Sequence, residues 1–340
     1  MQYVLAVDGG NTKTIALVAA LDGTILGAGR GGCGDIYNSR SGLDWAEAAA
    51  EAMANIEYAV THALQAAHVK AADLTAAVFN MAGADWPEDL AFLQAAMEAR
   101  GFGRTILVQN DALGVLHAAV SDNTGVSVIC GTGAATGARG PDGRVWHSSF
   151  WQDETQGSHQ LGLKALYAVY RSELGIEPPT MLTRRVLDFF NLNSVEEVLY
   201  LFTNRTKRST RGLDSLTPLL LDEAEAGDPL ARRIVQEHGS ALANYAQVAA
   251  RRVGLEGTAF ALVLAGGVFR HPSSLLANTI IEKVRAISPE VRPIHSRFEP
   301  IIGVLFSALE AAGVTIDDAL LAKLIPTIPP AALFATVAEW

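Results

Sequence analysis

The sequence predicts an α/β protein built from two similarly folded lobes. Apolar strands run into glycine-rich turns in both halves of the chain, at residues 3–14 and again at 125–138. Predicted strands also alternate with predicted helices, as in a layered α/β fold. The chain has 340 residues, which is too long for one small core and suits two domains.

The first half is expected to form one α/β layer. Its predicted elements are strands at 3–7, 14–20 and 24–29, a helix at 44–67, a strand at 75–80, a helix at 87–100, a strand at 105–109 and a helix from Asp111. The 44–67 segment is dense in Ala, Glu and Met and contains no Gly or Pro, which favours one long helix. This order of elements is typical of a ribonuclease-H-like layer.

The second half starts the pattern again near Thr124. It then becomes mainly helical over 158–254, and it ends with a strand at 259–265, a helix at 272–287 and a short strand near 291–295. We therefore predict lobes at 1–118 and 119–312, with hinges near 117–124 and 300–305. A tail at 313–340, interrupted by Pro326, Pro329 and Pro330, is expected to pack back on one of the lobes.

The first glycine turn is the most informative segment. The apolar run Val4–Val7 leads to Asp8, and the turn residues Gly9, Gly10, Asn11 and Thr12 follow. Glycines let backbone N–H groups approach an anion closely, although the same residues are also common in ordinary hairpin turns. Two further strands that end on glycines, at 131–133 and at 266–267, favour a phosphate-binding function over a plain turn.

Together these motifs resemble those of a known superfamily. The segments DGGNTKT at 8–14, CGTGA at 130–134 and LAGGV at 264–268 resemble the two phosphate motifs and the adenosine motif of the sugar kinase, Hsp70 and actin superfamily. Within it, the chain resembles the BadF/BadG/BcrA/BcrD-type ATPases and N-acetylglucosamine kinases. Supporting segments are Gly83-Ala84-Asp85, Asn110-Asp111-Ala112, the run 226–231 and Pro300-Ile301-Ile302-Gly303. The resemblance covers residues 3 to 312 and implies two actin-like ATPase lobes around a nucleotide cleft.

The resemblance implies ATP and Mg²⁺ as cofactors. The implied ATP-binding residues are Gly9, Gly10, Asn11, Thr12, Lys13, Thr14, Gly131, Thr132, Gly133, Gly266 and Gly267. Asp8 is the expected Mg²⁺ ligand, and Asp111 is the expected general base for a substrate hydroxyl. The positive end of a helix dipole would keep Asp111 ionised, whereas the alternative interpretation of this residue is a plain helix N-cap.

The implied substrate is a hexose or an amino sugar, with N-acetylglucosamine and glucosamine as the first candidates. The candidate sugar contacts are Asp35, Asn38, Asp85 and Asp153. The family's Gly-x-x-Asn loop corresponds to residues 31–38, where Asp35 stands in place of the usual asparagine; a simple glycine-rich turn is the alternative. A second departure is Thr155-Gln156, which replaces the family's Asp-Glu pair, so that Asp153 and Glu154 become candidates to take over its contacts.

Other classes of protein fit the sequence less well. A net charge of −10 argues against a nucleic-acid-binding surface. One basic cluster, Arg205, Lys207, Arg208 and Arg211, is interpreted as a solvated loop, with contact to nucleotide phosphates as the alternative. No secretion signal is evident, and the longest apolar run, about eleven residues, is too short for a membrane span. We expect a cytoplasmic enzyme with no membrane partner. Because dimers are common among soluble enzymes, a homodimer is the candidate oligomer.

Two rival functions remain open. The first is an ATPase that drives electron transfer to a dehydratase, as in other family members, which ligate an iron–sulfur cluster through cysteines. Only Cys33 and Cys130 are available for this, without cluster-like spacing, and the histidines form no zinc-like pattern. The second is a sugar-sensing protein without turnover, prompted by the replaced Asp-Glu pair.

Overall fold

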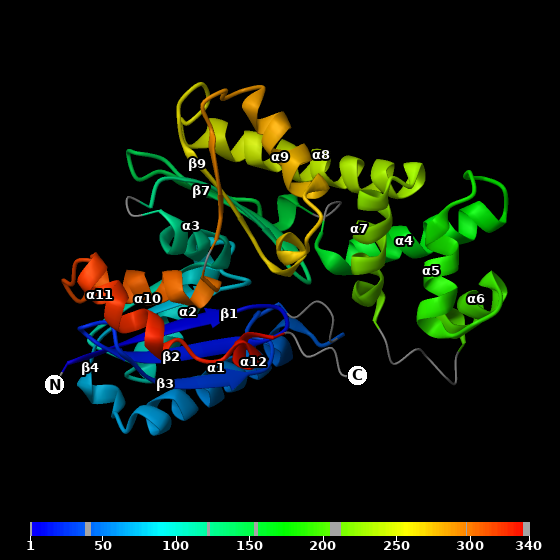
Figure 1. Ribbon diagram of the computed structural model, residues 1–340. Coiled ribbons are helices and arrows are strands. Elements are labelled where there is room, and N and C mark those ends of the chain that lie inside the picture. Colours follow the sequence, from blue (N-terminus) through cyan, green and yellow to red (C-terminus); the bar gives the residue numbers. More distant parts are fainter. Residues whose placement is uncertain are drawn as a thin grey trace. The chain divides into compact units, whose positions relative to one another are not determined.

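The computed structural model of the protein describes residues 2–37, 42–120, 123–152, 156–204, 212–296 and 298–335. Contacts divide the chain into two compact units (Figure 1). The first unit comprises Met1–Ser127, Pro141–Gly143 and Ser296–Thr336. The second comprises Val128–Gly140, Arg144–His295 and Val337–Trp340.

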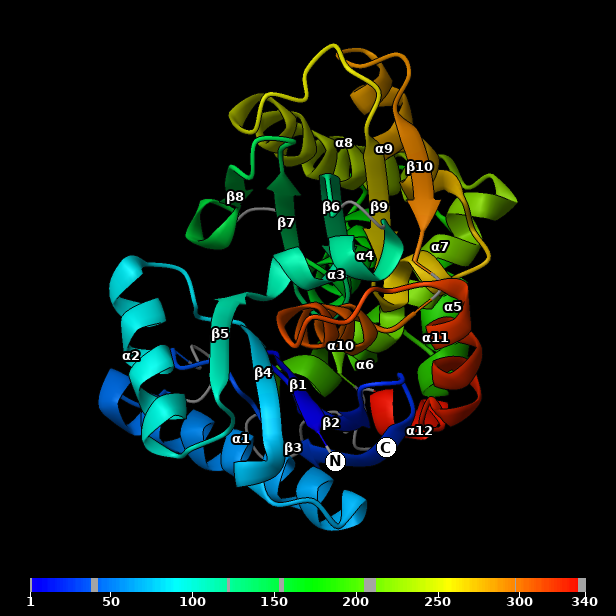
Figure 2. The ribbon, with the colours of Figure 1, turned by 90° about the vertical axis from the view of Figure 1, so that its left-hand side faces the viewer.

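The first unit contains a mixed five-stranded sheet. Its strands are β1 (Tyr3–Gly9), β2 (Thr14–Ala20), β3 (Ile25–Gly31), β4 (Leu74–Met81) and β5 (Thr105–Asn110). Figure 2 shows the order β3-β2-β1-β4-β5. The first three strands form the predicted antiparallel meander, while β4 and β5 run parallel to β1. The carboxyl ends of β1, β3, β4 and β5 therefore meet at one edge of the sheet.

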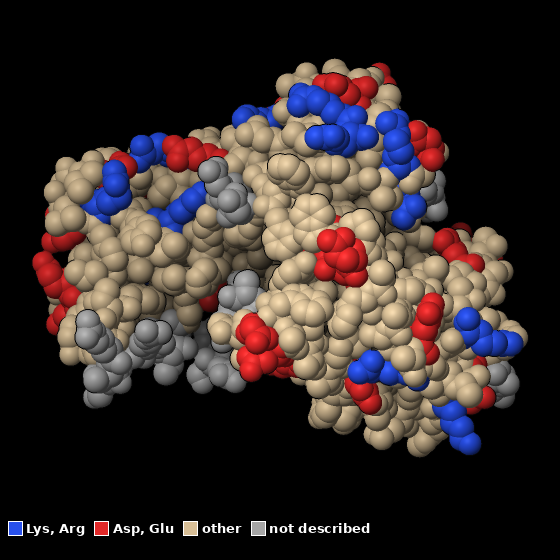
Figure 3. All heavy atoms as spheres, turned by 180° about the vertical axis from the view of Figure 1, so that it is seen from behind, with Lys and Arg blue, Asp and Glu red and all other residues tan. Residues whose placement is uncertain are grey.

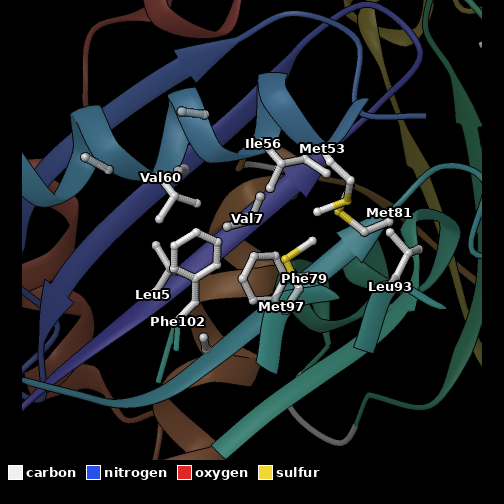
Figure 4. Packing of buried hydrophobic residues seen from close by; sticks show 14 of the residues in the cluster. Leu5, Val7, Met53, Ile56, Val60, Phe79, Met81, Leu93, Met97 and Phe102 are labelled. Atoms are coloured by element: carbon white, nitrogen blue, oxygen red, sulfur yellow. The ribbon is translucent and has the colours of Figure 1, made fainter. Parts of the chain in front are cut away.

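Helices cover both faces of this sheet. Alternate residues of β1 point to opposite faces, so that Leu5 and Val7 pack in one core cluster and Val4 and Ala6 in another. Figure 4 shows the first cluster, to which α1 (Trp45–Ala67) contributes Met53, Ile56 and Val60, and α2 (Pro87–Ala99) contributes Leu93 and Met97. The second cluster lies under α10 (Pro300–Ala311).

Local signals explain where α1 begins and how it packs. The Asp44 side chain accepts a hydrogen bond from the Glu47 amide at 2.9 Å and caps the first turn. A Cβ built on Gly29 of β3 would overlap the backbone of Ala59 in α1, so glycine is what lets this helix lie directly on the strand. Short connections complete the layer: η1 (Ala71–Asp73), η2 (Asp111–Leu113) and α3 (Gly114–Ala119).

The C-terminal part of the chain packs on this first unit. Ile301, Ile302 and Leu305 of α10 are buried in the same cluster as Val4 and Ala6 of β1. Beyond α10 lie α11 (Asp318–Leu324), η6 (Ile325–Thr327) and α12 (Ala331–Phe334). This division differs from the predicted boundary at residue 312, because the apolar face of α10 is buried against the N-terminal sheet.

The second unit contains a sheet with the same topology. Its strands are β6 (Gly125–Cys130), β7 (Ala134–Arg139), β8 (Val145–His147), β9 (Ala261–Ala265) and β10 (Arg292–His295), in the order β10-β9-β6-β7-β8. Strand by strand, this order corresponds to β5-β4-β1-β2-β3 of the first sheet. The predicted α/β fold with a repeated layer is confirmed.

The rest of the second unit is helical, as the sequence predicts. Its helices are η3 (Ser149–Trp151), α4 (Ser158–Glu173), α5 (Met181–Phe190), α6 (Val195–Thr203), η4 (Leu213–Leu216), α7 (Thr217–Ala226), α8 (Pro229–Arg252), η5 (Gly267–Arg270) and α9 (Leu275–Arg285). Asp228 caps α8 through the Ala231 amide at 2.9 Å and also accepts from the Met181 amide at 2.9 Å. One carboxylate thus joins the starts of α5 and α8.

The surface carries charges of both signs. Figure 3 shows Lys and Arg lying among Asp and Glu on one face. Within the described ranges, we find no helix with the length and hydropathy that crossing a membrane requires.

Candidate functional site

Four carboxylates gather at the carboxyl edge of the first sheet. Asp8 lies at the end of β1, Asp35 follows β3, Asp85 follows β4 and Asp111 follows β5. Burial, followed by the negative charges of Asp8, Asp85 and Asp35, raises the pKa of Asp111 to about 7. A hydrogen bond from the Ala112 amide acts in the opposite direction. The parallel strands therefore bring together residues that are up to about a hundred positions apart in sequence.

Asn110, rather than Asp111, caps the helical turn after β5. Its Oδ1 accepts from the Ala112 amide at 3.0 Å, and its Nδ2 donates to Asp85 Oδ1 at 2.9 Å. The plain-cap interpretation of Asp111 is therefore not what the structure shows. The dipole argument also fails, because the turn is a single 3-10 turn and burial raises the pKa of this carboxyl. The sequence did not single out the link that Asn110 makes to Asp85.

Asp8 lies in a polar row across the sheet. The pKa of Asp8 is raised to about 6, mainly by burial; the Lys13 ammonium opposes this rise and the charge of Glu299 adds to it. Its neighbour on β4 is Asn80, which is fully buried and accepts from Gln109 Nε2 at 2.7 Å. Among the described residues, Asn80 Nδ2 has no hydrogen-bond partner. Sequence reasoning missed Asn80, although a polar residue ending a buried strand was a usable signal.

The β1–β2 turn is closed by backbone hydrogen bonds. The Gly10 amide donates to Lys13 O at 2.9 Å, and the Gly34 amide donates to Gly10 O at 2.9 Å. Asn11 and Thr12 are exposed at the tip. A Cβ on Gly9 would overlap the Met81 side chain, so this glycine also serves the packing of β1 on β4.

Two of the predicted ATP residues have partners inside the protein. Thr14 is fully buried, and its hydroxyl donates to Gly32 O at 3.0 Å. Lys13 Nζ donates to the Phe334 carbonyl of α12. Arg30 Nη1 donates to the carbonyls of Leu333 and Ala335, each at 2.7 Å, so two cations hold this end of the tail beside the hairpin.

The predicted sugar loop is held by its own side chains. Asp35 is buried, and its Oδ1 accepts from the Tyr37 amide at 3.0 Å. Gly83 has a φ of +81°, and a Cβ there would overlap Asp35 Oδ1, so only glycine fits beside this carboxylate. The Tyr37 hydroxyl donates to Asp89 at 2.9 Å, a partner that the sequence did not suggest. Asn38 and Asp153 lie outside the described residues.

In the second unit, two glycine turns that are distant in sequence come together. Gly266 has a φ of +104°, and a Cβ there would overlap the carbonyl of Cys130. The Gly131–Gly133 loop (residues 131 to 133) therefore lies directly against Gly266. The Gly131 amide donates to Gly133 O at 2.9 Å, which closes the loop.

Two glycines in this unit, Gly131 and Gly267, have free space in front of them. A Cβ on Gly131 would find its nearest atom, Gly133 O, 4.0 Å away, and one on Gly267 would find nothing within 4 Å. Backbone without side chains and with free space in front of it suits the close approach of an anion such as a phosphate chain. The residues present therefore fit ATP.

The carboxylate set also fits Mg²⁺. Among the described residues, no group of three or more His, Cys, Asp or Glu could hold a metal by itself. Mg²⁺ bound with a nucleotide needs only one or two carboxylates, because waters and phosphate oxygens complete its shell. Asp8, at the strand end beside Lys13, can supply one.

Two residues bear on the rival functions. Gln156, in the replaced Asp-Glu pair, turns its side chain inward: Oε1 accepts from the Ala134 amide at 3.4 Å, and Nε2 donates to Gln152 O. Cys130 is fully buried, and burial raises the pKa of its thiol to about 12. A thiol that resists ionisation is poorly suited to ligating an iron–sulfur cluster.

A repeated five-stranded sheet with glycine turns at the strand ends defines an actin-like ATPase fold of the sugar kinase type. The chain belongs to the BadF/BadG/BcrA/BcrD ATPase family, whose family model matches residues 5–308. The resemblance that the sequence motifs suggested is confirmed.

Curated relatives match most of the chain. It is 26% identical over 276 residues to an N-acetylmuramic acid/N-acetylglucosamine kinase of Clostridium acetobutylicum, covering 80% of this chain and 87% of the relative. It is 23% identical over 317 residues to an N-acetyl-D-glucosamine kinase of Dictyostelium discoideum, covering 91% of this chain and 98% of the relative.

Solved structures share the fold. A candidate N-acetylglucosamine kinase from Chromobacterium violaceum matches with a TM-score of 0.63 at 21% identity, covering 91% of this chain and 99% of the other. A glucokinase of the ROK family from Streptomyces griseus, solved with glucose and AMPPNP, matches with a TM-score of 0.55 at 16% identity, covering 90% and 98%.

Proposed function

We propose that this protein is an ATP-dependent sugar kinase. The observation that carries the proposal is the position of Asp111, which lies beside Asp8 and Asp85 at the carboxyl edge of the first sheet. Phosphoryl transfer requires a group to accept the proton of the acceptor hydroxyl and groups to neutralise phosphate charge. Side chains of the first unit and glycine backbone of the second fit these two requirements.

The glycine turns and the hairpin contribute to ATP binding. Backbone N–H groups of Thr132 and Gly133, and of Asn11 and Thr12 at the tip of the β1–β2 turn, donate to phosphate oxygens. Asp8 holds Mg²⁺, which neutralises phosphate charge when it is bound. Lys13 adds a positive charge near Asp8, consistent with its effect on the pKa of that carboxyl.

Asp111 acts on the sugar hydroxyl. Its carboxylate accepts the hydroxyl proton while the hydroxyl oxygen forms a bond to the γ-phosphorus of ATP. The bond between that phosphorus and the bridging oxygen breaks, and ADP leaves. Burial and neighbouring carboxylates raise the pKa of Asp111 to about 7, which is close to the pH at which a general base works best.

The substrate is an amino sugar, with N-acetylglucosamine as the first candidate. The names of both curated relatives include this sugar, and one also includes N-acetylmuramic acid. Asp35 and Asp85 supply carboxylate oxygens at the same edge as Asp111, and Asn38 and Asp153 are further candidate contacts. Carboxylates suit sugar hydroxyls because they accept strong, directional hydrogen bonds.

A substrate panel tests the proposal. The purified protein is incubated with MgATP and, in turn, N-acetylglucosamine, glucosamine, N-acetylmuramic acid and glucose, and each product is identified by mass. We expect one amino sugar to gain a phosphate with release of one ADP. No phosphorylated product with any sugar, together with thermal stabilisation by one of them, would favour the sensor instead.

A further inference from the structure

His238 is a buried histidine outside the groups that the proposed mechanism uses. It lies in the middle of α8 and is 0% exposed. Its Nε2 lies 2.8 Å from the carbonyl oxygen of Gln156, and its Nδ1 lies 3.1 Å from Lys164 Nζ of α4. Both ring nitrogens therefore have a partner.

The two partners determine the protonation of the ring. Lysine can only donate, so Nδ1 accepts; a carbonyl can only accept, so Nε2 carries the proton and donates. The ring is neutral in this arrangement. Burial and the adjacent Lys164 agree with it, since they lower the pKa of His238 to about 3. His238 thus makes a directed hydrogen bond to one backbone carbonyl over a wide pH range.

That carbonyl belongs to the peptide that joins Gln156 to Gly157. Gly157 lies so close to the Gly131–Gly133 loop that a Cβ on it would overlap the carbonyls of Gly131 and Gly133. The next residue, Ser158, donates its amide to Gly131 O at 2.7 Å. A displacement of the Gln156–Gly157 peptide would therefore be transmitted directly to the loop.

The hydrogen bonds from the start of α4 to the Gly131–Gly133 loop also set the direction of the loop amides. In a trans peptide, the C=O of one residue and the N–H of the next point in opposite directions. The Gly131 carbonyl faces the Ser158 amide, and the Thr132 carbonyl faces the His159 amide at 3.4 Å. The N–H groups of Thr132 and Gly133 consequently point away from α4, side by side, as in a backbone anion-binding nest.

We infer that His238 is a positioning residue for the Gly131–Gly133 loop, holding it through the Gln156 carbonyl in the orientation that binds nucleotide phosphates. The inference rests on the proposed role of this loop in ATP binding. Lys164 supports it by holding the ring in the tautomer that donates from Nε2.

A matched pair of amide variants tests the inference. The terminal amide of His238→Gln can reach the position of Nε2 and donate to Gln156 O, whereas that of His238→Asn reaches only the position of Nδ1. MgADP affinity is measured by titration calorimetry, together with KM for ATP, kcat and the melting temperature. We expect His238→Asn to weaken ADP binding about tenfold and to raise KM for ATP with little change in kcat, and His238→Gln to stay within about threefold of wild type.

Two further variants and the wild-type protein separate the outcomes. Val284→Ala shortens a buried side chain of α9 and controls for lost stability, so it should lower the melting temperature without changing ADP affinity. If His238→Asn does not fold, Lys164→Met replaces it, with a weakening of about threefold expected. Wild-type ADP affinity in a folded His238→Asn protein would overturn the inference, whereas absence of ADP binding by the wild type would overturn the proposed function itself.

Discussion

The two sheets share one strand order but use their strand ends differently. In the first unit, the carboxyl edge carries carboxylates: Asp8 near the end of β1, Asp85 after β4 and Asp111 after β5. In the second unit, the corresponding strands β6 and β9 are followed by Gly131 and Gly266, which offer backbone without side chains. The same strand order therefore presents carboxylates at this edge in one copy and open glycine backbone in the other.

Because of this difference, substitutions in the two units should affect different properties of the protein. A carboxylate can be neutralised without changing the backbone, so variants in the first unit should alter chemistry more than stability. Gly266 of the second unit lies against the backbone of Cys130, so a side chain at this position should alter loop geometry and stability together.

The largest expected effect comes from removing the proposed base. Asp111→Asn keeps the size of the side chain but cannot accept the proton, so kcat should fall about 10²- to 10⁴-fold while MgADP affinity stays near wild type. Steady-state kinetics and calorimetry measure the two quantities. Asp73→Asn, an exposed carboxylate in η1, is the matched control and should leave both unchanged. Normal turnover by Asp111→Asn would remove this residue from the mechanism.

A substitution on the open face of the second unit should act on nucleotide binding. A Cβ at Gly131 meets no close atom, so Gly131→Val should fold but place its methyl groups in the space that the proposed function assigns to phosphate. We expect MgADP affinity to fall about tenfold or more. Calorimetry with an unchanged melting temperature would support this, and wild-type affinity would show that the loop does not face the nucleotide.

Adjacent glycines distinguish close packing from open space. Gly266→Ala would strain a backbone with a φ of +104° and would overlap the Cys130 carbonyl, so the free energy of unfolding should fall by about 1–3 kcal/mol. Gly267→Ala has free space around its new methyl group and should change this free energy by less than about 0.5 kcal/mol. Urea denaturation compares them, and equal losses would contradict the observed packing.

The smallest expected effect is a displaced pH profile. A general base must be ionised, and the pKa of Asp111 is raised to about 7, so kcat/KM should rise with pH and level off above about 7. The charge of Asp85 contributes to that rise in pKa, so in Asp85→Asn the acidic limb should move to lower pH by less than about one unit. A profile that moves to higher pH would show that Asp85 does not act through charge.

Much of this protein was predictable from local patterns. The meander, the α1 helix and the glycine turns follow from strand alternation, capping by Asp44 and glycine placement, because each depends on residues close in sequence. The family resemblance followed from the same turns. The family resemblance placed Asp8 and Asp111 at strand ends, and the parallel strands bring those ends to one edge.

Other features depended on contacts between distant residues. The cap at Asn110, the buried row with Asn80, the inward Gln156 and the hydrogen bonds of His238 each require a partner whose position no local pattern specifies. The assignment of α10 to the first unit is of the same kind, since burying Ile301 and Leu305 against β1 is decided by which apolar face is available.

The sequence by itself determined the repeated α/β layers and the glycine turns that mark their strand ends, since strand periodicity and backbone freedom are properties of short segments. Only the tertiary structure decided how protonated the carboxylates are and which peptide holds the Gly131–Gly133 loop. Electrostatic environment and hydrogen-bond direction depend on what lies within a few ångströms in space, whatever the separation along the chain.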